Sequence, residues 1–251
     1  MYPVIFESAS FTLFSYPLFM GLSWGLAYRL SQYFLERMNI SEKGFAGLFW
    51  GIFVFSWIGS KIFFLAFSSG GEFVQHSKSL SFWLGGGFVF YGGLIFSLLY
   101  LGFYCFVLKK FPIKKTFILL GPLSFGHALG RVGCFLAGCC FGVKTDMVWG
   151  YNLHGHNRHP VQLYESIGLL IIGGIITKLM LKNKIEGIKL FVIYFLGYSL
   201  LRFTLEFYRG DIIRGVYIWG LSTSQLISII LFLVLILYLV RLKVFSGPHQ
   251  V

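Results

Sequence analysis

Three groups of polar side chains could carry chemistry in this sequence, and all three lie within or beside long apolar runs. In the first group, His127, Arg131 and Cys134 are spaced four and three residues apart, so they share one face of a helix with about 3.6 residues per turn. A guanidinium pairs with phosphate in a bidentate manner, so Arg131 predicts a site for an anionic head group. The alternative is an ion pair with Glu165 or Glu206 that only holds helices together. We favour the functional interpretation, because a charge in an apolar span is costly to keep.

The second group is Tyr198, Arg202, Glu206 and Arg209, whose spacings of four, four and three residues also give one helical stripe. Arg202 and Glu206 are one turn apart and can form an ion pair along the helix. That pair is either a self-neutralised structural feature or part of an anion site, and the sequence leaves both interpretations open.

The third group opens another apolar run, where residues 158–165 read RHPVQLYE. Pro160 suits the first turn of a helix, where no backbone amide donor is needed. Gln162 and Glu165 then lie about one turn apart on one face. A carboxylate in an apolar span is costly unless it is paired or protonated, so the simplest role for Glu165 is to orient an arginine.

The cysteines offer a further chemistry. Together with His127, the thiols of Cys134, Cys139 and Cys140 could hold zinc, although their spacing is not that of a standard zinc finger. Cys134 is alternatively a nucleophile that His127 activates, or simply a small buried hydrophobic residue. We expect neither a metal nor a cofactor, and a metal-dependent membrane protein is the alternative that these cysteines keep open.

The elements that must position these groups are transmembrane helices. Of the 251 residues, 57% are hydrophobic and 12% are charged, about half the charged fraction of a soluble domain. Seven continuous apolar segments are each close to the ~20 residues that a helix needs to cross a bilayer, and none alternates as a barrel strand does. They cover residues 11–28, 44–67, 82–108, 116–137, 161–181, 190–207 and 221–240. We therefore expect an all-α bundle of seven transmembrane helices that forms one membrane domain over residues 1–251.

Loop charges orient this bundle, because positive residues collect on the cytoplasmic side. Of the 21 Lys and Arg residues, thirteen lie in one set of connections or, for Lys178, in the last turn of the span that leads to it; five lie in the alternate set and three lie deeper inside predicted spans. These sets are Arg29, Arg37, Lys43, Lys109, Lys110, Lys114, Lys115, Lys178, Lys182, Lys184, Lys189, Arg241 and Lys243; then Lys78, Lys144, Arg158, Arg209 and Arg214; then Lys61, Arg131 and Arg202. The N-terminus is expected outside and the C-terminus in the cytoplasm. The net charge of +12 then reflects loops that face anionic membrane lipids, and we expect no nucleic-acid partner.

Taken together, these motifs resemble phosphatidylglycerol–prolipoprotein diacylglyceryl transferase, an enzyme of the bacterial inner membrane. The resemblance runs from the first predicted span to the last. Its motifs are Gly130 to Gly133 with Phe135 and Gly138, Arg158 to Glu165, Tyr198 with Arg202 and Phe203, Glu206 to Arg209 with Asp211, Tyr16, and Ser222 to Gln225. Several motifs in the right order make the resemblance specific.

The resemblance implies a multi-pass enzyme that moves the diacylglyceryl group of phosphatidylglycerol to the lipobox cysteine thiol of a prolipoprotein and releases glycerol phosphate. Arg131 would bind the lipid phosphate and stabilise the leaving group, and Arg202, held by Glu206, would act similarly. Tyrosines would place the head group, while Gln162 and Glu165 would position the cations. The implied catalytic residues are Arg131, Arg202, His127, Cys134 and Tyr91, and the implied substrate-binding residues are Tyr16, Lys61, Gly92, Gly93, Gln162, Glu165, Tyr198, Glu206 and Arg209.

Four positions depart from the family pattern. The His-Gly-Gly of the third span, whose histidine is a candidate base, reads Tyr91-Gly92-Gly93 here, and neutral tyrosine is a poor base near neutral pH. A family asparagine is Cys134, a glutamate is Cys139 and an arginine of the second span is Lys61. His127 is therefore our candidate base, with a cysteine-linked intermediate as the alternative route. The alternative functions are a membrane lipid transferase with another acceptor and a non-catalytic phospholipid-binding protein.

Overall fold

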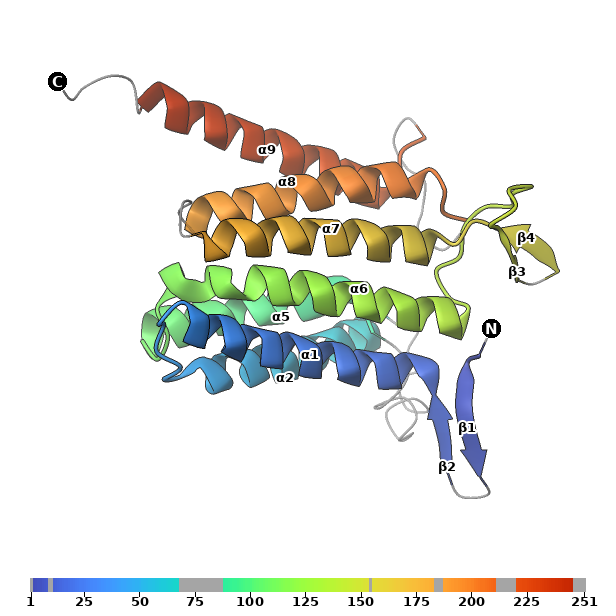
Figure 1. Ribbon diagram of the computed structural model, residues 1–251, viewed down its shortest axis with the longest axis horizontal. Coiled ribbons are helices and arrows are strands. Elements are labelled where there is room, and N and C mark those ends of the chain that lie inside the picture. Colours follow the sequence, from blue (N-terminus) through green and yellow to red (C-terminus); the bar gives the residue numbers. More distant parts are fainter. Residues whose placement is uncertain are drawn as a thin grey trace. The chain divides into compact units, whose positions relative to one another are not determined.

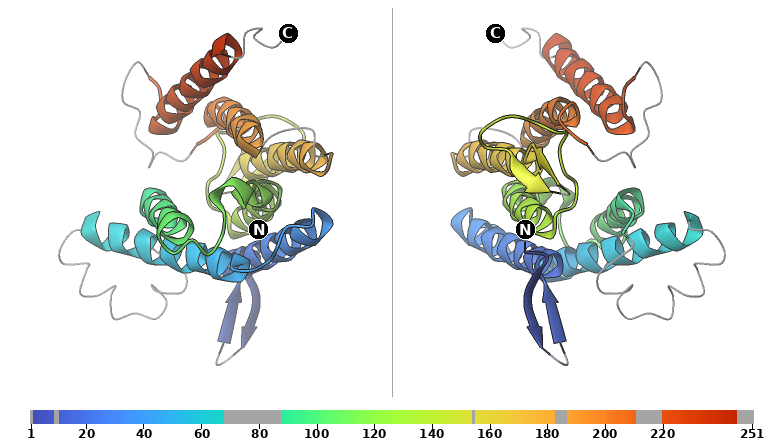
Figure 2. Two further views of the ribbon diagram at one scale, coloured as in Figure 1. Left: turned by 90° about the vertical axis from the view of Figure 1, so that its left-hand side faces the viewer. Right: turned by 90° about the vertical axis from the view of Figure 1, so that its right-hand side faces the viewer.

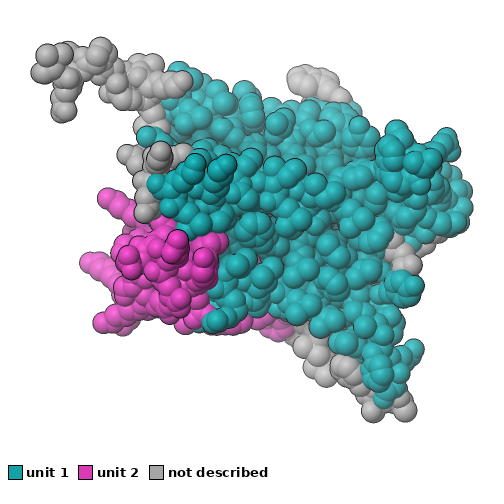
Figure 3. Space-filling view, in the orientation of Figure 1, with its two compact units in different colours: residues 1–30, 117–251 teal, residues 31–116 magenta. Residues whose placement is uncertain are grey.

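The computed structural model describes residues 2–8, 11–67, 88–153, 155–182, 187–210 and 220–245 (Figure 1). The chain divides into two compact units, residues 1–30 with 117–251 and residues 31–116, which Figure 3 colours separately. Several positions discussed above, among them residues 82–87 of the third predicted span, Lys78, Lys184, Asp211 and Arg214, lie outside the described residues.

The first unit carries most of the polar motifs. It begins with the antiparallel strands β1 (Val4–Ser8) and β2 (Phe11–Phe14), followed by the first part of helix α1 (Ser15–Arg37). A short 3-10 helix, η2 (Ile113–Leu119), leads into α6 (Leu120–Ala137), and a small hairpin of β3 (Tyr151–Leu153) and β4 (His156–Arg158) follows. Helices α7 (Val161–Leu181), α8 (Gly187–Glu206) and α9 (Thr223–Phe245) complete it. Helix α6 packs on α7, α7 packs on α8, and α8 packs on α9 (Figures 1 and 2).

Two buried serines set the register between α6 and α7. The hydroxyl of Ser124 donates to the carbonyl of Leu169 at 2.7 Å, and the hydroxyl of Ser166 donates to the carbonyl of Ala128 at 2.9 Å. Small residues and hydroxyl hydrogen bonds between helices are typical of packing within membranes. One of these bonds is donated by α6 and the other by α7. Together they fix the position of α6 along the axis of α7, and with it the alignment of their polar residues.

Local sequence signals end α6 and begin α9. Gly138 adopts a left-handed conformation with φ of 73°, and the amide of Cys139 donates to the carbonyl of Cys134, which is the arrangement of a Schellman turn. At α9, the amide of Ser222 donates to the side chain of Gln225, and the amide of Gln225 donates to the hydroxyl of Ser222. This reciprocal capping box fixes the start of α9 beside the polar residues of α8.

The second unit is built on α2 (Phe45–Phe67) and α5 (Phe90–Gly102), which continues into a short π-helix, η1 (Phe103–Val107). Glycines bring α2 and α5 into close contact, because a Cβ atom on Gly92 would clash with the carbonyl oxygen of Gly59. The hydroxyls of Tyr100 and Tyr104 then donate to carbonyls of α2 and of the residue that precedes it. Here the glycines serve helix packing.

A helical membrane protein is confirmed. Within the described ranges, five helical segments are long and apolar enough to cross a membrane, and a shorter apolar helix covers Tyr91–Val107. The long segments are Phe45–Ala66, Ile113–Ala137, Val161–Leu181, Gly187–Glu206 and Thr223–Arg241. The count of seven and the orientation of the termini stay predictions.

The first predicted span, residues 11–28, is wrong in its boundaries. Residues 11–14 form β2, because this short apolar stretch pairs with β1, and the helix begins at Ser15. Pro17 fits there because the first turn needs no amide donor. The helix then continues to Arg37, past the apolar run, because Leu and polar residues with good helix propensity follow without a breaker.

Replacement of Gly92 by Ala should destabilise the protein by about 1–3 kcal/mol, because the added methyl group must displace the backbone of α2 at Gly59. The matched control is Gly102→Ala at the end of the same helix, where nothing lies within 4 Å of the added Cβ atom. Thermal unfolding in detergent measures both variants. Equal midpoints for the two variants would contradict the close packing of α2 and α5.

Candidate functional site

The carboxylate of Glu165 on α7 is the centre of the polar residues. It is fully buried, and Arg131 Nη2 lies 2.9 Å from its Oε1 atom. The hydroxyl of Tyr198 donates to the same oxygen at 3.2 Å, and His127 Nε2 lies 3.8 Å from it. Arg202 Nη1 approaches the other oxygen, Oε2, at 3.7 Å. Side chains from α6 and α8 thus converge on one carboxylate of α7.

Arg202 is held by a second set of partners. Its Nη2 atom lies 2.7 Å from Glu206 Oε2, one turn along α8, as the spacing predicts. The same nitrogen donates to the hydroxyl of Ser224 on α9 at 3.2 Å. The guanidinium is therefore fixed from three helices.

Some buried polar atoms of this cluster have no hydrogen-bond partner. Among the described residues, Arg131 Nε and Arg202 Nη1 are buried donors without a hydrogen-bond acceptor, and Glu165 Oε2, 3.7 Å from Arg202 Nη1, is a buried acceptor without a donor. The guanidinium groups of Arg131 and Arg202 share the carboxylates of Glu165 and Glu206, and Arg209 acts electrostatically on Glu165 and on Arg202. Buried polar groups normally have partners, so this arrangement is suited to an additional anion.

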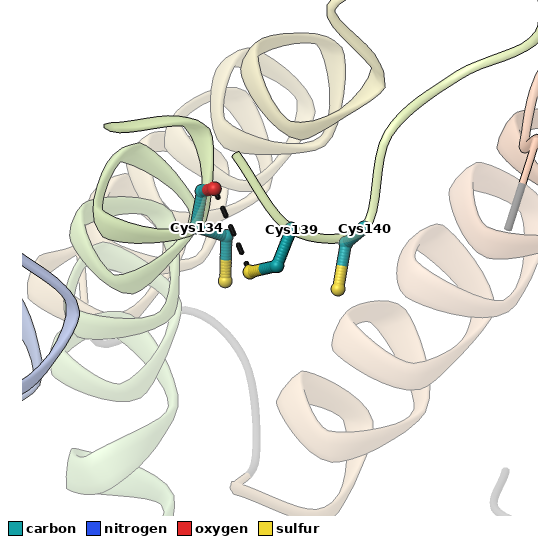
Figure 4. A group of neighbouring side chains, drawn as sticks. All are labelled: Cys134, Cys139 and Cys140. Carbon is teal, nitrogen blue, oxygen red and sulfur yellow. Dashed lines mark hydrogen bonds between the residues drawn. The ribbon is translucent and has the colours of Figure 1, made fainter. Parts of the chain in front are cut away.

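Three thiols gather at the end of α6 (Figure 4). The sulfur atoms of Cys134, Cys139 and Cys140 all lie within 4.8 Å of one another, and Cys139 Sγ donates to the carbonyl of Cys134 at 3.6 Å. Hydrogen bonds from the other two thiols lower the pKa of Cys140, and Arg209 and Arg131 lower it further. Three thiols from the helix end and the following loop thus lie close enough to act together.

The loop that carries these cysteines is tied to its surroundings. The side-chain nitrogen Nε2 of Gln162 donates to the carbonyl of Cys139 at 2.6 Å and to the hydroxyl of Tyr151 at 3.3 Å. Gln162 thus supports the cysteine loop directly. Tyr16 at the start of α1 is close enough to interact electrostatically with the three thiols and with Arg131.

Residues 141–143 join the cysteine loop to the end of α8. The amide of Val143 donates to the carbonyl of Tyr208, and the backbone of Gly142 pairs with that of Arg209. Arg158 Nη1 donates to the carbonyl of Gly142 at 3.2 Å, and its guanidinium lies 4.6 Å from the centre of the Phe141 ring. These contacts bring Arg209 and Cys140 together.

The first unit holds ten of the fourteen predicted site residues: Tyr16, His127, Arg131, Cys134, Gln162, Glu165, Tyr198, Arg202, Glu206 and Arg209. The other four belong to the second unit. There Lys61 is buried with its ammonium 3.9 Å from the centre of the Phe88 ring, Tyr91 is 43% exposed, and Gly92 and Gly93 pack against α2.

Two partners of the site are not among the predicted site residues. Ser224 lies within the motif Ser222 to Gln225 noted above and inside the capping box that opens α9, so its position next to a helix start was a usable signal. Tyr151 contacts Gln162 from a loop hairpin, where the sequence offers no periodicity that would place it.

Replacement of Glu165 by Gln should destabilise the protein by about 3 kcal/mol or more, because Arg131 and Arg202 lose their shared buried counter-charge. The control is Glu7→Gln on the exposed face of β1. Thermal unfolding of both purified variants measures the effect. A midpoint for Glu165→Gln equal to that of the control would contradict the central role of this carboxylate.

Comparison with known proteins identifies the family. The sequence model described as prolipoprotein diacylglyceryl transferase matches residues 3–241. A Finegoldia magna protein named phosphatidylglycerol–prolipoprotein diacylglyceryl transferase is 26% identical over 247 residues, covering 96% of this chain and 95% of that protein. Proteins of the same name from Campylobacter jejuni and Campylobacter curvus are 30% and 29% identical, covering 87% and 90% of this chain and 85% and 90% of their own. The chain belongs to the prolipoprotein diacylglyceryl transferase family.

Proposed function

We propose that this protein transfers the diacylglyceryl group of phosphatidylglycerol to a prolipoprotein cysteine thiol and releases glycerol phosphate. The names of its relatives support this activity. The observation that carries it is the buried cluster around Glu165, where Arg131 and Arg202 converge and where Arg131 Nε and Arg202 Nη1 have no hydrogen-bond acceptor among the described residues. A phosphodiester monoanion would supply acceptors for both donors.

The two arginines supply the electrostatics of the reaction. As the bond between the diacylglyceryl carbon and the phosphate oxygen breaks, negative charge grows on the departing phosphate. Arg131 Nε and Arg202 Nη1 are buried, so in a water-poor site they act more strongly on that charge than they would in water. Because Glu165, Glu206 and Ser224 already hold these guanidinium groups, little reorganisation is needed during the reaction.

Two apolar grooves in the first unit suit the acyl chains of the lipid. One, of about 420 Å³, is lined by Leu26 of α1, Leu129 of α6 and Leu170 of α7, and includes Ser166 next to Glu165. The other, of about 200 Å³, lies between α8 and α9 and includes Phe203, which follows Arg202. Both grooves are lined almost entirely by apolar side chains, as acyl chains require.

The protein is proposed to work as one membrane domain in the bacterial inner membrane, with its N-terminus outside and its C-terminus in the cytoplasm. In this orientation the end of α6 and the cysteine loop lie toward the outer face. The partners are then phosphatidylglycerol, the prolipoprotein and other membrane lipids, and no nucleic acid.

Replacement of Arg131 by Lys should lower kcat/KM for phosphatidylglycerol by roughly 10- to 100-fold. The lysine keeps the charge opposite Glu165 but loses bidentate contact with the phosphate. The kcat/KM is measured as transfer of radiolabelled diacylglycerol from phosphatidylglycerol to a lipobox peptide. The control is Arg241→Lys, at an exposed position at the far end of α9. Unchanged kinetics for Arg131→Lys would rule out phosphate recognition by this residue.

Replacement of His127 by Ala should reduce transfer by about 100-fold, because His127 is the candidate base of the first unit and its Nε2 atom lies beside Glu165, at 3.8 Å from Oε1. The matched control is His156→Ala, on exposed strand β4. Undiminished turnover in His127→Ala would remove this residue from the mechanism.

Expression of the protein in a bacterium depleted of its own transferase should restore viability and lipidated prolipoprotein. Growth is scored together with the mobility of a lipoprotein on gels and with release of glycerol phosphate from purified protein. Good expression with phosphatidylglycerol turnover but no lipobox modification would point to another acceptor. Lipid binding without glycerol phosphate release would indicate a non-catalytic phospholipid-binding protein.

A further inference from the structure

We propose that Cys134, Cys139 and Cys140 bind one zinc ion through three thiolates and leave its fourth position to the acceptor thiol of the prolipoprotein. The inference rests on the proposed function and names how the acceptor is activated. Among the residues that the structure describes, these three cysteines form the one group of at least three potential ligands that lie close together (Figure 4).

The geometry is close to that of a metal site. Zinc–sulfur bonds of about 2.3 Å in a tetrahedral site place sulfur atoms about 3.8 Å apart. The three sulfur atoms here all lie within 4.8 Å of one another. Side-chain rotations that shorten the sulfur–sulfur distances by about 1 Å would therefore close the site. The left-handed conformations of Gly138 and Cys140 turn the loop back over the end of α6, and Gln162 anchors it at Cys139.

The charge of the surroundings suits such a complex. Three thiolates and one zinc ion carry a net charge of about −1, which requires a cationic environment when partly buried. The backbone of Gly142 pairs with that of Arg209, and Arg131 lies one turn before Cys134 on α6, so two arginines neighbour the cysteine loop. The sites for the lipid phosphate and for the metal therefore share Arg131.

Three protein ligands and one open position are typical of catalytic rather than structural zinc. Cys134 is buried at the helix end, Cys140 is partly accessible and Cys139 is exposed, so a fourth ligand can approach from the side of the loop. A thiol that coordinates zinc is deprotonated. The acceptor would thus become a thiolate without a strong base among the side chains of the protein.

The transfer step balances without an oxidant or reductant. The acceptor thiol binds as a thiolate, and its proton passes through solvent to His127. Its sulfur forms a bond to the diacylglyceryl carbon, the bond from that carbon to the phosphate oxygen breaks, and the electron pair leaves on the phosphate beside Arg131. The product thioether is a neutral, weaker ligand, which favours its release.

A metal role also fits the cluster better than a covalent carrier does. A diacylglyceryl group attached to Cys134 would itself be a thioether, and a thiolate is a poor leaving group from an unactivated carbon. Such an intermediate would not pass the group to the acceptor. A single carrier would also give no role to the two further thiols within 4.8 Å of one another and of Cys134.

The metal content of the intact protein, purified in detergent and loaded with zinc alone, tests the site. Wild type should retain about one zinc ion per chain after desalting, and Cys139→Ser and Cys140→Ser should bind zinc at least 100-fold more weakly. The matched control is Cys105→Ser, a buried free thiol in η1, which should behave as wild type. Equal zinc retention in all four proteins, or none in wild type, would overturn the proposal.

Cobalt substitution tests the open position. A lipobox peptide with a free thiol should change the visible spectrum of the cobalt-loaded protein, whereas the same peptide with serine in place of cysteine should not. Removal of metal by a chelator should reduce transfer at least 100-fold, and zinc should restore it. Full transfer by metal-free protein would overturn this inference and leave the proposed function standing. A thiol-dependent cobalt spectrum without any transfer to the peptide would instead refute the proposed function alone.

Discussion

The requirement that the buried carboxylate of Glu165 be neutralised constrains the rest of the first unit. A lone carboxylate in an apolar interior would be too costly to keep charged, so cations must reach it from neighbouring helices. Arg131 arrives from α6 and Arg202 from α8, each at its own oxygen, while Tyr198 donates a hydrogen bond. The α6–α7 register set by Ser124 and Ser166 is the register that lets Arg131 reach Glu165. Arg202 in turn contacts Ser224, so α9 is linked to the same centre.

This constraint also explains why the cluster is suited to an anion. The carboxylates hold the guanidinium groups in place but do not use all of their donors, since Arg131 Nε and Arg202 Nη1 are left unmet within the described part of the chain. In the proposed function, a phosphate would supply the acceptors that these two donors lack. The residues that hold the helices together would then also bind the substrate, and the long ion pair of Arg202 with Glu165 is the contact most easily exchanged for a phosphate.

Periodicity made much of this site predictable. Residues 127, 131 and 134, and residues 198, 202 and 206, share helical faces because their spacings match the helical repeat, and the Arg202–Glu206 pair follows directly. The strands before α1 were not predictable, because a short apolar hairpin that precedes a helix reads as part of one apolar run. The return of Cys139 and Cys140 onto Cys134 depends on left-handed residues in a loop, and the contact of Tyr151 with Gln162 depends on tertiary folding. Periodicity describes neither.

The charges around α6 bear on how an acceptor thiol loses its proton. A protonated imidazole at His127 is supported by Glu165 at 3.8 Å, but Arg131 lies one turn away and repels it. The proposed metal–thiolate complex, with its net negative charge, would have the opposite relation to the same arginine, because Arg131 lies one turn before Cys134 and would attract it. In a site rich in guanidinium groups, it is therefore easier electrostatically to make the thiol more acidic than to place a stronger base beside it.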